Sequence, residues 1–474
     1  MKKILFLLLP AFALAQITVG TTGGETHISS NTSWDGEVVM EGKIVVDAGA
    51  TLTIAPGTLV KCKSSANPED ATVLVVAKGG MINAAGTAAD PIVFTAFDAV
   101  ANPEVRGKWG GIVLLGTAPI GEDGNNEKIE GIQGGASVTW NYYGGTDAND
   151  NSGILQYVSI RHGGAIIAQG NELNGLTLGG VGAGTTIENI EIISNSDDGL
   201  ECFGGNVDVT NLLVYNQGDD AVDIDEAYSG TVSNVVIHLG AASDLAFEID
   251  GREDTNTAVD SSILTSISYT IDGVTVIGSG GASDGGSQLG DWKSDATGVN
   301  KNIVYTNFAN DETIEGIDDD TYATGANNGT NLTFENVDYV GGNTEADILA
   351  NTGAGPDAAW LEVLGTQTPG TGATFGNFAW TYWSTFSSFA DGTLSVELVE
   401  ENVVSFTLYP NPFVNEINVA SNKSIDVITI YNTVGQKVQE ARNTNQVDVS
   451  SLNNGLYLIE VKADDSIYVG KMLK

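Results

Sequence analysis

The sequence contains few cysteines and histidines, and this scarcity argues against two kinds of site. Cys62 and Cys202 lie far apart in the chain and define no disulfide framework, so we expect Cys202 to be a small buried apolar side chain. The three histidines, His27, His162 and His238, are too scattered along the chain to predict a zinc site.

Basic residues are also scarce, because 19 lysines and arginines stand against 61 aspartates and glutamates, and the formal net charge is −42. A field of this sign repels nucleic acids and anionic membranes, so no nucleic-acid partner is expected. Cations and neutral glycans are the partners that this charge allows. Proline is sparse at 10 residues, whereas 60 glycines without a collagen triplet predict an all-β protein with many turns between short strands.

Long apolar runs are absent after the first residues of the chain. At the N-terminus, Lys2 and Lys3 precede the apolar run from Ile4 to Leu9, and Ala13-Leu14-Ala15 has the pattern of a cleavage site. We therefore predict a signal peptide over residues 1–15. No later run approaches the roughly 20 apolar residues that span a bilayer, so we expect an exported mature chain without a transmembrane segment.

The centre of the chain repeats itself. Three segments align with Asn189, Asn211 and Asn234 in register: IENIEIISNSDDGLECF, VTNLLVYNQGDDAVDID and VSNVVIHLGAASDLAFEID. A period of about 22 to 25 residues, with two short alternating β runs in each repeat, is typical of one coil of a solenoid. We therefore predict a right-handed parallel β-helix over residues 16–352.

Stacked coils place equivalent residues in ladders about 4.8 Å apart. Two inward ladders of apolar residues are predicted: Leu200, Val222 and Phe247, and Cys202, Ile224 and Ile249. A third ladder, made of asparagines, should occupy a turn, because asparagine tolerates a left-handed backbone and its amide can bond between coils. Its expected members are Asn189, Asn211, Asn234, Asn302 and Asn336.

Beyond residue 352 the composition changes. TQTPGTGATFGN is typical of a linker, and we expect the aromatic stretch FAWTYWSTFSSF to shield the strand edges of the last coil. Residues 353–402 are assigned to this terminal cap and linker. From residue 403 onward, alternating short strands predict a small C-terminal β-sandwich domain, residues 403–474.

Several motifs occur together in this C-terminal segment: Pro410-Asn411-Pro412, the strand and turn IYNTVGQKV, and Gly455-Leu456-Tyr457. The segment resembles the C-terminal sorting domain of the type IX secretion system of Bacteroidetes. The resemblance implies that residues 403–474 engage the type IX secretion machinery, and that the protein is secreted or attached to the outer-membrane surface. Leu52 to Gly57, which has the pattern L-x-I-x-P-G, resembles the opening coils of exported, pectin-lyase-like β-helix proteins.

Carboxylates recur beside the inward apolar positions of the coils. Because neighbours of an inward residue point outward, Glu201, Asp223 and Glu248 should stack in one exposed ladder, followed by Asp225 and Asp250. Stacked carboxylates in water repel by less than roughly 1 kcal/mol per pair, so solvent alone can sustain them. The same residues are suitable ligands for calcium, which takes about six to eight oxygen ligands. No cofactor is required, and calcium is left open.

The paired aspartates of successive coils allow a catalytic interpretation. DDG and GDDAVDI resemble segments of the polygalacturonase-type glycoside hydrolases, which are also right-handed β-helices. The resemblance implies that Asp198, Asp219 and Asp220 supply a general acid and a water-activating base.

The remaining parts of that family's pattern are missing. Ser243-Asp244-Leu245 stands where His-Gly is expected, and no Arg-x-Lys follows, because Arg252 precedes two acidic residues. A pectate-type lyase would need calcium and a basic residue, but Arg161 and Arg252 are the only arginines of the central coils, and neither is on the acidic ladder.

These absences favour a non-enzymatic protein. We predict a monomeric surface or adhesive protein that binds a glycan or calcium. The alternative is a polysaccharide hydrolase or lyase that uses the acidic residues of adjacent coils.

Overall fold

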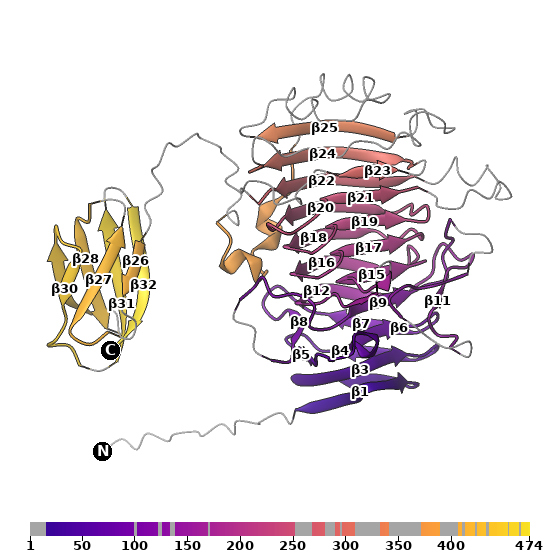
Figure 1. Cartoon of the computed structure of the whole chain (residues 1–474), viewed down its shortest axis with the longest axis horizontal. Helices are drawn as coiled ribbons and strands as arrows, with labels where there is room; N and C mark the ends of the chain where they lie inside the picture. The colour runs from indigo at the N-terminus through magenta and orange to yellow at the C-terminus, as the bar shows by residue number, and fades with distance from the viewer. Residues whose placement is uncertain are drawn as a thin grey trace, which may run out of the picture. The chain divides into compact units, whose positions relative to one another are not determined.

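Most strands of the larger part of the chain pair in parallel with a strand of a neighbouring coil (Figure 1). The chain divides into two units, Met1–Ser395 and Val396–Lys474. The computed structural model describes residues 16–474 except 99–101, 122–125, 133–137, 169–170, 252–267, 280–289, 294–295, 309–331, 341–370, 389–405, 410–412, 422–423, 433–435, 454 and 464–465. The predicted signal peptide and most of the predicted linker lie outside the described residues.

One side of the solenoid is a parallel sheet of short strands, which we call the short-strand sheet. After β3 (Glu37–Val46), its strands are β6 (Val73–Val76), β9 (Gly111–Leu115), β15 (Leu176–Gly179), β17 (Leu200–Phe203), β19 (Val222–Asp225), β21 (Phe247–Asp250) and β23 (Asp291–Lys293). Each strand pairs in register with the next one in this order.

Longer strands form the other side of the coils. They are β12 (Gly153–Arg161), β16 (Thr186–Ile193), β18 (Val209–Tyr215), β20 (Thr231–His238), β22 (Tyr269–Ile277), β24 (Gly298–Thr306) and β25 (Leu332–Val340). The first coils also contain β1 (Ile17–Ile28), β2 (Thr32–Trp34), β4 (Thr51–Ile54), β5 (Leu59–Cys62), the short helix η1 (Pro68–Asp70), β7 (Met81–Ala85) and β8 (Ile92–Ala96). The prediction of an all-β parallel β-helix is confirmed.

The inward faces of the coils carry both predicted apolar ladders. Leu200 pairs with Val222 and Val222 with Phe247, while Ile224 lies between Cys202 and Ile249 in the next ladder. All six side chains are buried in one continuous core. Each coil packs its apolar side chains on those of the neighbouring coil. Because buried apolar surface contributes about 25 cal/mol per Å², every such contact between coils stabilises the fold.

The asparagine ladder lies at a bend in the middle of the long strands. All five predicted members have left-handed backbones, with φ between 53° and 58°. Their amides bond from coil to coil, since Nδ2 of Asn211 donates to Oδ1 of Asn189 at 3.0 Å and Nδ2 of Asn234 donates to Oδ1 of Asn211 at 2.5 Å. Gly273, with φ 73°, takes the same position between Asn234 and Asn302. The predicted ladder is confirmed, with one glycine in it that the repeat pattern did not show.

The aromatic segment after the coils lies along their side. Residues 371–388, which we call the strap (orange in Figure 1), contain the short helices η3 (Phe375–Phe378) and η4 (Trp383–Thr385). The N–H of Gly372 donates to the carbonyl of Asn302 at 3.2 Å, and the N–H of Trp383 donates to the Glu191 carboxylate at 2.8 Å. The expectation that this stretch shields the last coil is therefore wrong for residues 371–388, because its aromatic side chains pack on apolar residues at the side of earlier coils. The side chains in this contact are Phe375, Phe378 and Trp383 of the strap and Ile193, Leu213, Val236 and Ile277 of the coils.

Two excursions of the chain cover part of the outer face of the short-strand sheet. The first contains β10 (Glu127–Lys128) and β11 (Tyr142–Tyr143), and the second contains β13 (Ile166–Ala168) and β14 (Asn171–Glu172). Their apolar side chains pack on Val75, Val113 and Leu115, which point outward from the sheet. We call these two excursions the cover.

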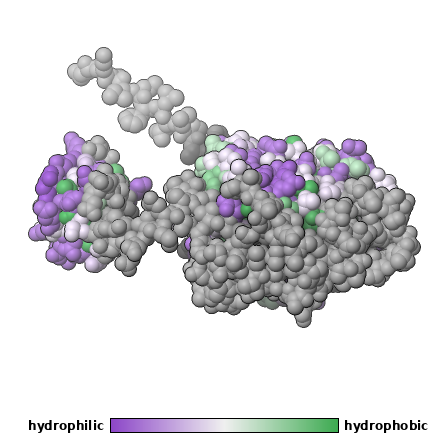
Figure 2. All heavy atoms as spheres, turned by 90° about the horizontal axis from the view of Figure 1, so that it is seen from above, coloured by the Kyte–Doolittle hydropathy of each residue, from purple (hydrophilic) through white to green (hydrophobic). Residues whose placement is uncertain are grey.

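The C-terminal unit consists of two antiparallel sheets. One contains β26 (Phe406–Tyr409), β27 (Glu416–Ser421) and β30 (Gln446–Asp448), and the other β28 (Val427–Asn432), β29 (Lys437–Arg442), β31 (Leu456–Ala463) and β32 (Ser466–Leu473). Apolar residues of both sheets share one core, and Figure 2 shows mostly hydrophilic residues on the coloured surface of this unit. The predicted small β-sandwich is confirmed.

Candidate cation-binding site

The turn before each central short strand contains a side chain that accepts a backbone N–H from the next coil. Oδ1 of Asn174 accepts the N–H of Asp198 at 3.2 Å, Oδ1 of Asp198 accepts the N–H of Asp220 at 2.9 Å, and Oδ1 of Asp220 accepts the N–H of Leu245 at 2.6 Å. We call Asn174, Asp198 and Asp220 the acceptor ladder. Because a neutral amide performs this task at position 174, the hydrogen bond itself does not require a charge.

Glu201, Asp223 and Glu248 stack on the outward face of the short-strand sheet, in the predicted register. Their predicted exposure is wrong for two of the three, because Glu201 is only 5% exposed and Asp223 only 7%. Water alone therefore does not explain this ladder.

Side chains of the cover and of a neighbouring turn lie close to the Glu201 end of this ladder. The ring of Tyr143 packs against Phe203, with ring centroids 5.8 Å apart, and its hydroxyl donates to Glu226 at 2.6 Å. Gly179 permits this approach, since a Cβ atom there would lie 2.8 Å from the Tyr143 ring. The amide of Asn174 donates to the Glu201 carboxylate.

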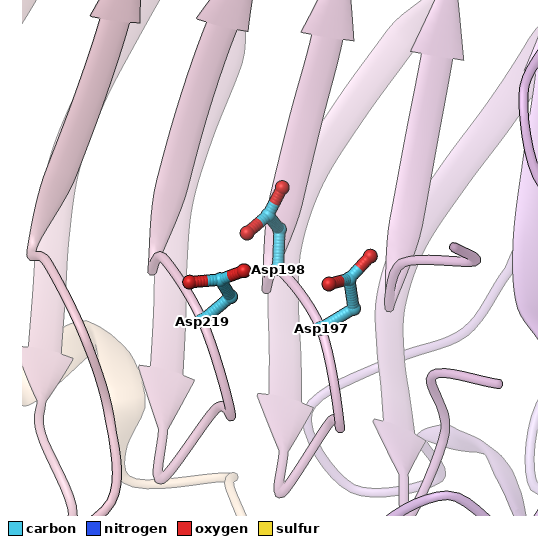
Figure 3. Close-up of side chains that lie close together, drawn as sticks. All are labelled: Asp197, Asp198 and Asp219. Atoms are coloured by element: carbon cyan, nitrogen blue, oxygen red, sulfur yellow. The ribbon is translucent and has the colours of Figure 1, made fainter. Parts of the chain in front are cut away.

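Carboxylate oxygens converge in this region in two overlapping groups. Asp198, Glu201 and Asp223 form the inner group, whose side chains are all buried. Asp197, Asp198 and Asp219 form the outer group, of which only Asp219 is exposed (Figure 3). In each group, one oxygen of every member lies within 4.8 Å of the others, and Asp198 belongs to both.

The structure thus combines residues to which the sequence assigned different roles. Asp198, a predicted catalytic residue, lies with Glu201 and Asp223, two predicted calcium ligands. The predicted catalytic residues Asp219 and Asp220 form a further, more exposed group with Asp244. The other predicted ligands belong to none of the groups found among the described residues; they are Asp225, Glu248 and Asp250. Asp197 and Asp244 were missed, although Asp197 adjoins Asp198 in the sequence.

Burial and repulsion raise the pKa values of these carboxyl groups. Burial, followed by repulsion from Glu172 and Asp219, raises the pKa of Asp197 to about 8. The pKa of Asp198 is raised well above its usual value by burial and by Asp197. Burial and nearby negative charges have the same effect on the pKa values of Glu201 and Asp223. A positive ion placed between these carboxylates would therefore be strongly attracted.

Asp223 gives the clearest sign of a missing positive charge or donor. Its Oδ1 is buried and has no hydrogen-bond partner. A buried acceptor in this condition costs about 1–3 kcal/mol, and more when it is charged. No ion pair found among the described residues includes a member of the inner group.

The inner group has the donor chemistry and dimensions that calcium requires. Calcium binds oxygen at about 2.3–2.6 Å, so two ligands on opposite sides of the ion lie about 4.6–5.2 Å apart. The three oxygens of the inner group lie within 4.8 Å of one another, which is close enough for one ion to contact all three, and three carboxylates can supply three or more of the oxygens.

The catalytic interpretation fits this geometry less well. The carboxyl groups of an inverting hydrolase lie about 6.5–9.5 Å apart. Here Asp219 lies in one group with Asp198 and in another with Asp220, and in each group selected oxygens are within 4.8 Å of one another. Arg161 is not available as a lyase base at this site, because its guanidinium lies 3.7 Å from Glu191 and over the ring of Tyr382. Arg252 lies outside the described residues.

Comparison with protein families agrees with this architecture. Residues 26–383 match the model of the pectate-lyase-like β-helix domain. The chain belongs to this family. The predicted resemblance of its body to right-handed, pectin-lyase-like proteins is thereby confirmed, and the matched range contains the cover, the coils from the end of β1 onward and the strap as far as Trp383.

The tail of this pectate-lyase-like protein has its own match. Residues 407–474 match the secretion system C-terminal sorting domain, which confirms the predicted type IX sorting domain. The protein is therefore secreted or attached to the cell surface, and its tail engages the type IX secretion machinery. Within the described residues, no helix is long and apolar enough to cross a membrane.

Individual proteins add little to these two matches. A solved structure with some similarity is the tailspike protein of the Acinetobacter phage vB_ApiP_P1, at 10% identity over 94% of this chain and 72% of that one. Its TM-score of 0.20 is too low to support a structural argument. No curated protein matches the chain.

Proposed function

We propose that this secreted β-helix protein is a non-enzymatic surface protein that binds calcium at the inner group. The observation that carries the proposal is the burial of Asp198, Glu201 and Asp223 within 4.8 Å of one another, with Oδ1 of Asp223 lacking a hydrogen-bond partner. A calcium ion there would supply the missing interaction and neutralise repelling charges of two coils.

The cover supports a structural role for the ion. Glu201 and Asp223 are buried on the outer face of the sheet, beside the cover, whereas a bound polysaccharide would need open access to carboxylates. The calcium ion would lock successive coils into a rigid monomeric scaffold. That scaffold would present its remaining surface to a neutral glycan, the partner class that a net charge of −42 favours.

Calcium should therefore stabilise the mature chain, residues 16–474. At a calcium concentration 100 times the dissociation constant, the free energy of unfolding should increase by about 2.7 kcal/mol, measured as a rise in the melting temperature over the EDTA-treated protein. Asp223→Asn should abolish most of this rise. Asp208→Asn is the matched control, because Asp208 is exposed and its Oδ1 accepts the N–H of Thr231, a hydrogen bond that asparagine can retain.

The enzymatic alternative has its own test on the same protein. The mature chain is incubated with a panel of polysaccharides, with and without calcium, and assayed for reducing ends and unsaturated products. Turnover that Asp220→Asn abolishes would replace the proposal with a hydrolase or lyase. A melting temperature unchanged by calcium would refute the calcium site.

A further inference from the structure

We infer that the acidic turns hold two divalent cations side by side, with the Asp198 carboxylate shared between them. The inner ion lies among Asp198, Glu201 and Asp223, and the outer ion among Asp197, Asp198 and Asp219. This inference rests on the proposed function, because it adds an outer ion to the inner one.

The outer group offers more than a cluster of acidic residues. Asp197 is only 8% exposed, and no hydrogen bond to its carboxylate is found within the described parts of the chain. In Figure 3, one oxygen of Asp219 points toward Asp198, although both groups are acidic.

Charge balance favours two ions over one. The inner and outer groups together contain five different carboxylates, of which four are buried. Fully ionised, they have a charge of about −5, so one divalent ion leaves about −3 in the site and two leave about −1. Because charges in a poorly solvated site interact far more strongly than in water, the second ion removes most of the remaining repulsion.

Asp198 is suited to the shared position. Its Oδ1 already accepts the N–H of Asp220, which fixes the carboxylate between the two groups. A carboxylate that bridges two metal ions holds them about 3.5–4 Å apart. The outer group includes the exposed Asp219, so ions reach the buried inner group from solvent by way of the outer one.

The stoichiometry of calcium binding tests this inference. The EDTA-stripped mature chain is titrated with calcium chloride by isothermal titration calorimetry, in about 0.15 M salt to screen weak surface binding. The wild type should bind two ions. Glu201→Gln and Asp219→Asn should each bind one, and Asp198→Asn should bind none with comparable affinity.

Asp198→Asn is informative because it should fold. Asn174 shows that an asparagine at the equivalent position of the previous coil accepts the next coil's N–H, so the substitution removes the ligand charge and retains the hydrogen bond. Asp208→Asn should bind two ions like the wild type, and circular dichroism verifies that every variant is folded.

The outcomes separate this inference from the proposed function. A wild type that binds a single ion lost in Glu201→Gln overturns the shared site and leaves the proposed function intact. The same conclusion follows if Asp198→Asn still binds one ion tightly. A wild type that binds no calcium overturns both.

Discussion

Aspartate has two separable effects in the turns of this protein, a hydrogen bond and a negative charge. Asp198 and Asp220 each use one oxygen to accept a backbone N–H from the next coil, as the neutral Asn174 does. The same aspartates also bring a negative charge into a poorly solvated place. The hydrogen bond contributes to the fold, whereas the charge is useful only with a cation, so the two effects can be separated by substitution.

We expect Asp198→Asn and Asp198→Ala to differ in stability when calcium is absent. Alanine leaves the buried N–H of Asp220 without an acceptor, which costs about 1–3 kcal/mol. Asparagine retains the acceptor and removes a repelling charge, so its free energy of unfolding should equal or exceed that of the wild type in EDTA. Urea unfolding of the three proteins measures the difference, and equal stabilities of the two variants would contradict the acceptor role.

Much of the repeat could be predicted from single residues, whereas the site could not. The asparagine positions and the alternating apolar residues gave the coil, its register and its inward ladders, because each depends on local backbone and nearest-coil contacts. The surroundings of Glu201 include Asn174 and Tyr143 of the cover, and no periodic pattern in the sequence links Tyr143 to the coils. Asp197 was not predicted as a site residue, because the hydrolase-like motif assigns the chemistry to Asp198.

At the scale of elements, the strap does not follow the repeat of the coils. Its Trp383 donates an N–H to Glu191 and its indole Nε1 donates to Nδ1 of His238 at 3.0 Å. His238 can accept this bond only when neutral, and burial lowers its pKa from 6.5 to about 4. Glu191, which is paired with Arg161, and Tyr215, whose ring centroid lies 5.1 Å from that of His238, are further titratable groups at this contact.

The contribution of His238 to stability should therefore be lost in acid. Between pH 6.5 and about 4 the unfolded chain binds a proton at His238 and the folded chain does not, so the free energy of unfolding falls as the pH falls. The loss attributable to this residue is at most about 3 kcal/mol. His238→Gln, which retains an acceptor without titrating, should show a flatter profile in urea unfolding between pH 7 and 4, and identical profiles would contradict the assignment.

At the scale of the whole molecule, the two units have separate cores and separate tasks. The core of the β-helix and that of the sorting domain share no residue. Stability of the body should thus be independent of the tail, while delivery to the surface should depend on it.

Deletion of residues 403–474 tests this division in the native host. The truncated protein should remain inside the outer membrane, as judged by protease accessibility on intact cells, because the sorting domain is missing. Its β-helix should melt at the same temperature as in the full chain by differential scanning calorimetry. Normal surface exposure of the truncated protein would contradict the role of the tail.

The strap also affects the cooperativity with which the coils of the solenoid unfold. In a plain solenoid each coil touches only its neighbours, so terminal coils can fray one at a time. Here the strap runs backwards along the stack and touches the coils of Asn302, Thr275, Asn234, Asn211, Glu191 and Arg161. Unfolding of any coil from β12 to β24 breaks a hydrogen bond or a cation–π contact with this one segment. These coils should therefore unfold in a single cooperative transition.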